Sequence, residues 1–272
     1  MSLRSKILVA KERAIAGLTL IFIFLSVLLG PFFTPYDPYQ INLDEIRMPP
    51  SIKHPFGTDQ KGRDILSRIL YGGRISLGVA LTATAVSFAL GFLIGTVSGY
   101  VGGRIDMFFM AIVDLLMAFP SLLLAIAISV VLPQQIYTAV IALAFVGWAP
   151  FARLVRGYVL VLRDEYFIQA ARAIGASEFR ILLKHIMPQC LYLASMYMGM
   201  KVGSFILSES ALSFLGLGAQ PPVPTWGGMI SASRAYMISD PWMVLFPGLA
   251  IAITAFSFNI LGDSLVTKRW SK

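Results

Sequence analysis

The sequence predicts an all-α membrane protein with six transmembrane helices and with both chain ends in the cytoplasm. Of its 272 residues, 57% are hydrophobic and only 13% are charged, whereas roughly a quarter of the residues in a soluble domain are charged. Several apolar stretches exceed the ~20 residues needed to cross a bilayer as a helix. A β-barrel would instead show short segments of alternating polarity.

The predicted spans are separated by short polar segments, and their basic residues set the orientation. The N-terminal tail, the region around Arg153–Lys184 and the C-terminal tail hold most of the 22 lysines and arginines. Cytoplasmic segments are enriched in Lys and Arg, so the net charge of +8 requires no nucleic acid partner. The six spans cover about Ala14–Phe33, Ser76–Val101, Ile105–Leu132, Ile136–Leu162, Leu191–Leu215 and Trp242–Val266.

These spans suggest three regions. Residues 1–75 form the tail, the first span and an extracytoplasmic loop, in which Thr58 or Asp59 caps an amphipathic helix that ends near Leu70 and lies flat on the membrane. Residues 76–266 form a five-helix core with a cytoplasmic loop at 164–188 and an outer loop at 216–241. Residues 267–272 form a cytoplasmic tail. The second span is rich in small residues and is expected to pack inside, whereas Pro120 is expected to kink the third.

The segment GTDQKGRD in the first outer loop combines two carboxylates with basic residues. Asp59 and Asp64 flank Arg63, and Gly57 precedes them. The pair could bind a metal or act in acid–base chemistry, but the neighbouring cations favour a salt-bridged structural loop. The chain's two histidines lie on opposite predicted sides of the membrane, so we expect no metal site.

The cytoplasmic segment 164–188 is predicted to form two short helices. Gly175 supplies the left-handed residue that ends the first, Ser177 caps the second, and Pro188 separates the second from the fifth span. Small and apolar residues give the segment a surface that either docks another protein or lies on lipid headgroups. The residues concerned are Gln169, Ala170, Ala171, Ala176, Phe179 and Leu183.

Ionisable residues inside membrane spans are functional candidates by default. Asp114, Lys201 and Glu209 either line a translocation path or pair with neighbouring helices. In the outer loop, Gln220, Pro222 and Trp226 belong to the rigid sequence AQPPVPTW, which either docks a partner and gates the path or only packs against the core.

Several motifs resemble those of ABC importer permeases. Gln169, Ala170, Ala171, Gly175 and Pro188 keep the spacing of the EAA loop of that family, although Gln169 stands where the family has Glu, and His185 and Met187 also depart from the pattern. The sequences GTDQKGRDILSR, SFLGLGAQPPVPTWGGMI and PWMVLFPGLAI are similar to those of the C-type permease of dipeptide, oligopeptide and nickel importers.

This resemblance implies a type I ABC importer permease fold in a bacterial or archaeal inner membrane. The chain would be no enzyme: two separate ABC ATPase subunits would bind ATP and Mg²⁺ and move the EAA loop as a coupling element, and the sequence has no phosphate-binding GxxxxGK[ST] motif. A B-type permease and an extracytoplasmic substrate-binding protein would complete the importer. The cargo would be di- or oligopeptides, or alternatively nickel or a metal chelate. A membrane sensor or enzyme with a docking hairpin is the alternative from another functional class.

Overall fold

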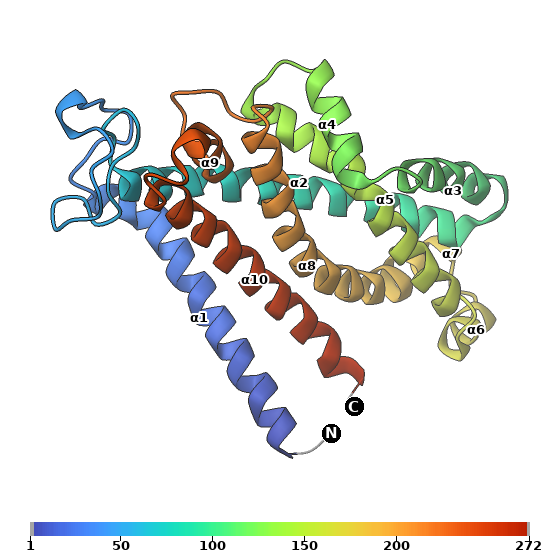
Figure 1. The fold of residues 1–272 in the computed structure, drawn as a ribbon. Coiled ribbons are helices and arrows are strands. Elements are labelled where there is room, and N and C mark those ends of the chain that lie inside the picture. The colour runs from blue at the N-terminus through green and yellow to red at the C-terminus, as the bar shows by residue number, and fades with distance from the viewer. Residues whose placement is uncertain (1–2, 271–272) are drawn as a thin grey trace.

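The computed structural model describes the backbone of residues 3–270 and the side chains of residues 11–30 and 32–263. Within this part the chain is helical and contains no β-strand, as predicted (Figure 1). The helices are α1 (Leu3–Phe33), α2 (Ile65–Val101), α3 (Gly103–Met117), α4 (Ser121–Val131), α5 (Ile136–Leu162), α6 (Tyr166–Ala173), α7 (Glu178–Ile181), α8 (Met187–Phe214), α9 (Trp226–Ser233) and α10 (Trp242–Trp270).

The predicted number of spans agrees with the structure if α3 and α4 together count as one. Five of the described helices are long and apolar enough to cross a membrane, and α3 with α4 forms a sixth, broken span. The two helices meet at 90°, so the single kinked helix expected across Pro120 is wrong. Pro120 lies outside both helices with ψ 121°, because proline disfavours helical backbone at the residue before it and removes a hydrogen-bond donor.

Helix α2 packs along α5 through a stripe of glycines, as the small residues of this span predict. Gly91, Gly95 and Gly99 recur every fourth residue and are buried. A Cβ atom on Gly99 would lie 2.9 Å from the carbonyl oxygen of Arg156, and one on Gly95 would lie 2.9 Å from Cβ of Val155. Glycine therefore allows close approach of the two backbones, on which packing in lipid depends.

The start of α2 corrects the prediction for the first outer loop. No separate helix runs from Thr58 or Asp59 to Leu70; α2 begins at Ile65 and continues unbroken to Val101. Asp64 is the N-cap, and its carboxylate accepts a 2.8 Å hydrogen bond from the backbone N–H of Ser67. Thr58 is instead held in a bridge to Asp64, so the amphipathic stretch is the first part of a long membrane helix.

The start of the fifth span also differs from the prediction. Pro188 does not separate a short helix from the span, because α7 continues through a π-helical turn, Leu182–Ile186, directly into α8. Pro188 lies in the first positions of α8, directly after the π-helical turn, and donates no backbone hydrogen bond to it. The result is one continuous helical segment from residue 178 to residue 214.

The arrangement in space agrees with the predicted topology. The beginning of α1, the end of α10 and the hairpin of α6 and α7 lie at one end of the molecule, and the loop 34–64 and α9 lie at the other (Figure 1). Residues 267–270 of the predicted tail extend α10, while residues 271–272 lie outside the described residues. The side chains of Arg4, Lys6, Lys268 and Arg269, on which the orientation partly rests, are also not described.

Candidate functional site

The segment 164–188, called the cytoplasmic hairpin below, turns at Gly175. Its φ is +82°, which is the left-handed region that glycine adopts without steric cost. The N–H of Gly175 donates to the carbonyl of Arg172 at 2.9 Å, and the N–H of Ala176 donates to the carbonyl of Ala171 at 3.0 Å. Ser177 then caps α7 by accepting from the N–H of Arg180. Both turn residues expected from the sequence are confirmed.

One face of the cytoplasmic hairpin is anchored to the membrane helices. Ile168, Ile181 and Ile186 are fully buried and belong to one cluster with Val155 and Val159 of α5. Polar contacts add to this anchor: Arg172 bonds Glu178 across the turn with an Nε–Oε1 distance of 3.1 Å, and Glu178 accepts from the Tyr100 hydroxyl at the end of α2. The cytoplasmic hairpin therefore moves with α2 and α5.

The opposite face exposes large apolar side chains. Tyr166 and Ile174 are each 86% exposed and Phe179 is 71% exposed. A cavity of about 540 Å³ lies beside them, and its walls include Phe167, Ala170, Ala171, Gly175, Ala176 and His185. Exposed apolar patches of this kind mark protein or membrane contacts.

The other predicted residues of this segment lie at its edges. Leu183 and Pro188 are exposed on the continuation toward α8. Gln169 is exposed and donates its side-chain N–H to the carbonyl of Asp164 at 3.0 Å. Ala171 is buried against the anchored face while Ala170 is exposed, so the two alanines serve opposite faces of α6.

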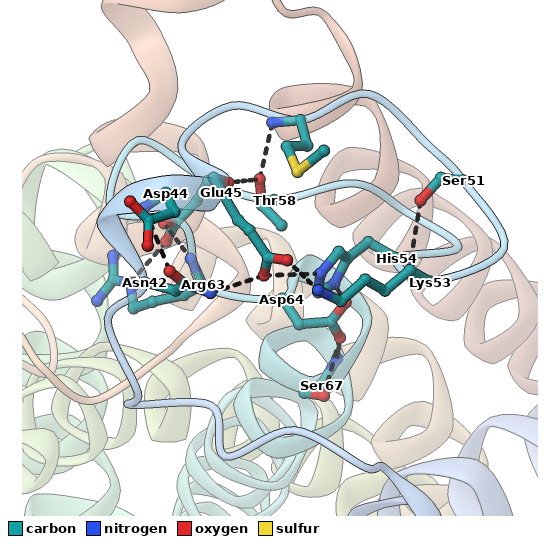
Figure 2. A network of polar contacts seen from close by, with 12 residues as sticks. Asn42, Asp44, Glu45, Ser51, Lys53, His54, Thr58, Arg63, Asp64 and Ser67 are labelled. Carbon is teal, nitrogen blue, oxygen red and sulfur yellow. Dashed lines mark hydrogen bonds and ion pairs between the residues drawn. The ribbon is translucent and has the colours of Figure 1, made fainter.

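The first outer loop holds a cluster of paired charges (Figure 2). Asp59 accepts from Nε of Arg63 at 2.7 Å and lies 3.6 Å from Nε of Arg68, and all three side chains are nearly buried. Gly57 has a φ of +76°, and a Cβ there would lie 2.6 Å from the carbonyl oxygen of Met48. The loop is thus the salt-bridged structure that the mixed charges favoured.

His54 is a central member of this network that the sequence did not identify. The buried ring lies between two carboxylates, with Nδ1 2.9 Å from Asp64 and Nε2 3.2 Å from Glu45 (Figure 2). Glu45 also pairs with Lys53. The hydrogen bond from Lys53, followed by that from His54, lowers the pKa of the Glu45 carboxyl, although partial burial opposes this, and the bond to Glu45 raises the pKa of Lys53. Ten residues separate His54 from Asp64, and no periodic pattern connects them.

Two of the acidic residues in the spans pair with arginines of α5. Asp114 is paired with Arg153, and Asp106 holds Arg156 through two bonds of 2.6 Å. These pairs join α3 to α5. For Asp114 the structure therefore contains the neighbouring-helix partner that was one of its two predicted alternatives.

Lys201 and Glu209 of α8 have different surroundings. The Lys201 ammonium lies 5.5 Å from the centre of the Tyr197 ring, a cation–π distance. Glu209 is fully buried and accepts from the Ser213 hydroxyl at 2.7 Å. A role of either residue in a translocation path stays a prediction.

The second outer loop packs Trp226 into the core. Trp226 is 1% exposed and donates its indole N–H to the carbonyl of Ile69 at 2.9 Å. Gln220 and Pro222 are exposed, and Gln220 closes its own loop by donating to the carbonyls of Gly216 and Gly218. For Trp226 the contacts are those of loop packing, while Gln220 and Pro222 remain available at the surface.

The side chains that commonly bind metal ions do not cluster in the described part of the chain. No group of three or more His, Cys, Asp or Glu side chains there is placed to hold a metal ion. His54, which has two carboxylate neighbours, and His185 lie at opposite ends of the fold. Cys190 is buried and free within the described structure.

Comparison with known proteins gives matches that all belong to transport permeases. Residues 91–270 match the family described as binding-protein-dependent transport system inner membrane component, and residues 8–50 match the N-terminal TM domain of oligopeptide transport permease C. The chain is 44% identical over 251 residues to the glutathione transport system permease protein GsiD of Escherichia coli and to that of Shigella sonnei, covering 92% of this chain and 83% of each relative.

A solved structure supports the fold independently. The chain is similar to a chain of the MetNI methionine ABC transporter in an inward facing conformation, with a TM-score of 0.60 and 16% identity, over 74% of this chain and 95% of that one. At this level of identity the likeness concerns the arrangement of the helices alone.

Proposed function

Because the chain belongs to the family of inner membrane components of binding-protein-dependent transport systems, we propose that it forms half of the translocation pathway of an importer for di- or oligopeptides. The chain is a multi-pass permease of the inner membrane and not itself an enzyme. Transporters of this architecture move substrate by rocking helix bundles around a central site.

The single observation that carries the proposal is the two-faced cytoplasmic hairpin. Its buried isoleucines fix it to α2 and α5, and its exposed aromatic face is free to bind a partner. A segment that is rigid toward the membrane and apolar toward the cytoplasm transmits force from a soluble subunit to the spans. We assign it the role of the coupling element that binds an ATP-hydrolysing subunit, with Gln169, Ala170, Gly175, Ala176, Phe179 and Leu183 at or beside the contact and Ala171 and Pro188 supporting it.

ATP and Mg²⁺ are then bound by two partner ATPase subunits, and this chain supplies no cofactor site of its own. A second permease of the B type is needed, because the six spans of one chain enclose only part of a pathway. An extracytoplasmic substrate-binding protein would deliver cargo to the outer loops. The exposed Gln220 and Pro222 are candidates for that contact, while Trp226 would support the loop from within.

A peptide is the proposed cargo because the similar permeases belong to glutathione transport systems, and glutathione is itself a tripeptide. Nickel or a metal chelate is the alternative. Lys201 and Glu209 are candidates for the path itself. Asp114 is a weaker candidate, since Arg153 already neutralises its charge.

Reconstitution tests the proposal. Co-expressed permeases and ATPase subunits are placed in liposomes with ATP inside and with the binding protein and labelled glutathione outside. ATP-dependent uptake is expected, and Gly175→Pro is expected to abolish it by breaking the 2.9 Å hydrogen bond to Arg172 and by forbidding the positive φ. Gly103→Pro is the matched control, since Gly103 is a positive-φ glycine of the α2–α3 turn with open space around it. Normal ATPase assembly and uptake in Gly175→Pro would refute the coupling role.

A further inference from the structure

A second cavity lies at the opposite end of the molecule from the cytoplasmic hairpin. It has a volume of about 390 Å³ and is built from the end of the first outer loop, the start of α2, the end of α8, the second outer loop and α9. Small-molecule sites typically enclose about 300 to 1,000 Å³, so a short peptide is of suitable size. The segments that form the cavity are far apart in sequence but gather where α9 meets the outer loops (Figure 1).

The walls of this outer cavity carry only positive formal charge. Lys61, Arg63 and Arg68 line it, and none of the residues that line it is an acid. Asp59, which does not line the cavity, pairs with Arg63 at 2.7 Å and with Arg68 at 3.6 Å. Its single negative charge offsets one of the three positive charges. Two positive charges remain for a ligand. Such a wall attracts carboxylates and repels free metal cations.

An unpaired acceptor lies among these cations. Gln60 lines the same cavity, and its buried side-chain oxygen has no hydrogen-bond partner in the described structure. A buried polar atom without a partner destabilises the fold, and a ligand N–H group would satisfy it. Cations and a free amide acceptor together match a ligand that has both a carboxylate and N–H donors.

The cavity also reaches the outer end of a membrane helix. Ser213 of α8 lines it, and the Ser213 hydroxyl donates to the buried Glu209 at 2.7 Å. The wall is therefore formed by a transmembrane helix as well as by loops. The cavity therefore adjoins the outer ends of α8 and α2, where a substrate would enter between the spans.

We propose that the outer cavity is an entry site for the carboxylate of a peptide substrate, with Lys61, Arg63 and Arg68 facing the carboxylate and Gln60 accepting from a peptide N–H. This inference rests on the proposed import of peptides and specifies where the substrate is first held by the permease. It also gives a reason to prefer peptides over free nickel ions as cargo. Lys61 is the residue to test, because its side chain is exposed whereas Arg63 and Arg68 also hold the loop together.

The direct test measures glutathione binding to the purified permease–ATPase complex in nanodiscs without the binding protein. Glutathione diethyl ester, in which both carboxylates are neutralised, is expected to bind at least about 10-fold more weakly. Lys61→Gln is expected to weaken glutathione binding about 3- to 5-fold, as for one partly exposed ion pair, and Lys61→Glu more strongly. Lys53→Gln is the control, because Lys53 is an exposed lysine of the same loop that pairs with Glu45 instead of lining this cavity.

Measuring glutathione uptake by the Lys61 variants distinguishes a failure of the entry site from a failure of the proposed transport function. If wild-type liposomes import glutathione in an ATP-dependent way, the proposed function holds whatever the Lys61 variants do. Equal binding of acid and ester, or unchanged glutathione binding by Lys61→Glu, would then overturn the entry site alone. Weaker docking of the binding protein to Lys61→Glu with unchanged peptide binding would also overturn it, since the cavity would then serve the protein partner.

Discussion

The first outer loop and the cytoplasmic hairpin both lie outside the spans, but the loop has a network of buried charges and the hairpin has none among the described residues. The loop buries His54, Asp59 and Arg63 and pairs each of them within the chain. The cytoplasmic hairpin leaves Ile174 and Phe179 facing the solvent. Buried charges are stable only when paired, and apolar side chains are seldom left exposed in such a cluster without a partner. The loop therefore satisfies these buried charges within the chain, whereas the exposed apolar face of the cytoplasmic hairpin has no partner in the described structure.

Two glycines with positive φ give the strongest test of this difference. Gly62 of the outer loop has a φ of +70° and its Cβ position overlaps the carbonyl of Asn42, whereas Gly175 has a φ of +82° with open space around it. Gly62→Ala is expected to destabilise the permease by about 2 to 5 kcal/mol, since steric overlap adds to backbone strain. Gly175→Ala is expected to cost about 1 to 2 kcal/mol from strain alone.

Thermal unfolding of both purified variants, followed by tryptophan fluorescence, measures the contrast. Gly216→Ala is the control, because Gly216 also has a positive φ and open surroundings but lies in the second outer loop. Its unfolding temperature should match that of Gly175→Ala. If Gly62→Ala unfolds at the same temperature as these two, the outer loop is not tightly packed and the comparison fails.

Removing a single carboxylate tests whether the loop depends on its internal pairs. Asp64 caps α2 at Ser67 and holds His54. Asp64→Ala is expected to cost about 2 to 4 kcal/mol, which combines a lost N-cap with a buried imidazole nitrogen left without its partner. Asp44→Ala, at an exposed acid of the same loop, should unfold like the wild type. Equal unfolding temperatures for the two variants would show that the network contributes nothing to stability.

The two regions also differ in how far the sequence predicted them. Gly175 and Ser177 act through local backbone geometry, so the turn of the cytoplasmic hairpin followed from residue types alone. The outer loop depends on contacts between distant residues, such as Arg47 with Asp240 at 3.2 Å. Which residue caps α2 could not be read from the sequence, because Thr58, Asp59 and Asp64 are all suitable caps and tertiary contacts select Asp64.

In the spans, too, the features that depend on local sequence were predicted, and a feature that depends on distant contacts was not. Hydropathy was sufficient to locate the membrane helices, since length and apolar content are properties of each segment. The 90° bend between α3 and α4 was not predicted. Pro120 marks where the helix breaks, but the angle depends on how α3 and α4 separately contact α5, through pairs such as Asp106 with Arg156.

A substitution on the exposed face of the cytoplasmic hairpin is expected to weaken partner binding without changing stability, whereas the substitutions in the outer loop change stability. Phe179→Asp is expected to leave thermal unfolding unchanged, because the side chain is 71% exposed. It should weaken binding of the ATPase subunit about 30-fold, corresponding to about 2 kcal/mol for a central aromatic contact. Co-purification and binding of the separated subunits measure this. Leu43→Asp, at a similarly exposed apolar residue of the outer loop, should bind ATPase normally; equal losses in both variants would indicate a general defect.

The smallest expected effect is the pH dependence of the Glu45–Lys53 pair at the edge of the outer network. The hydrogen bond from Lys53 lowers the pKa of Glu45 below its usual 4.5 and Glu45 raises that of Lys53 above its usual 10.5. The Glu45 carboxylate therefore contributes its full stabilisation above about pH 4.5, and this contribution is lost as the pH falls through the lowered pKa. The Lys53 ammonium contributes its full stabilisation below about pH 10.5, and this contribution is lost as the pH rises through the raised pKa. Thermal unfolding of Glu45→Gln should therefore differ from wild type at pH 6 to 9, and the difference should shrink as the pH falls through the lowered pKa of Glu45. A difference that stays unchanged as the pH is lowered until the protein unfolds in acid would mean that Glu45 stabilises the loop by packing and not by its charge.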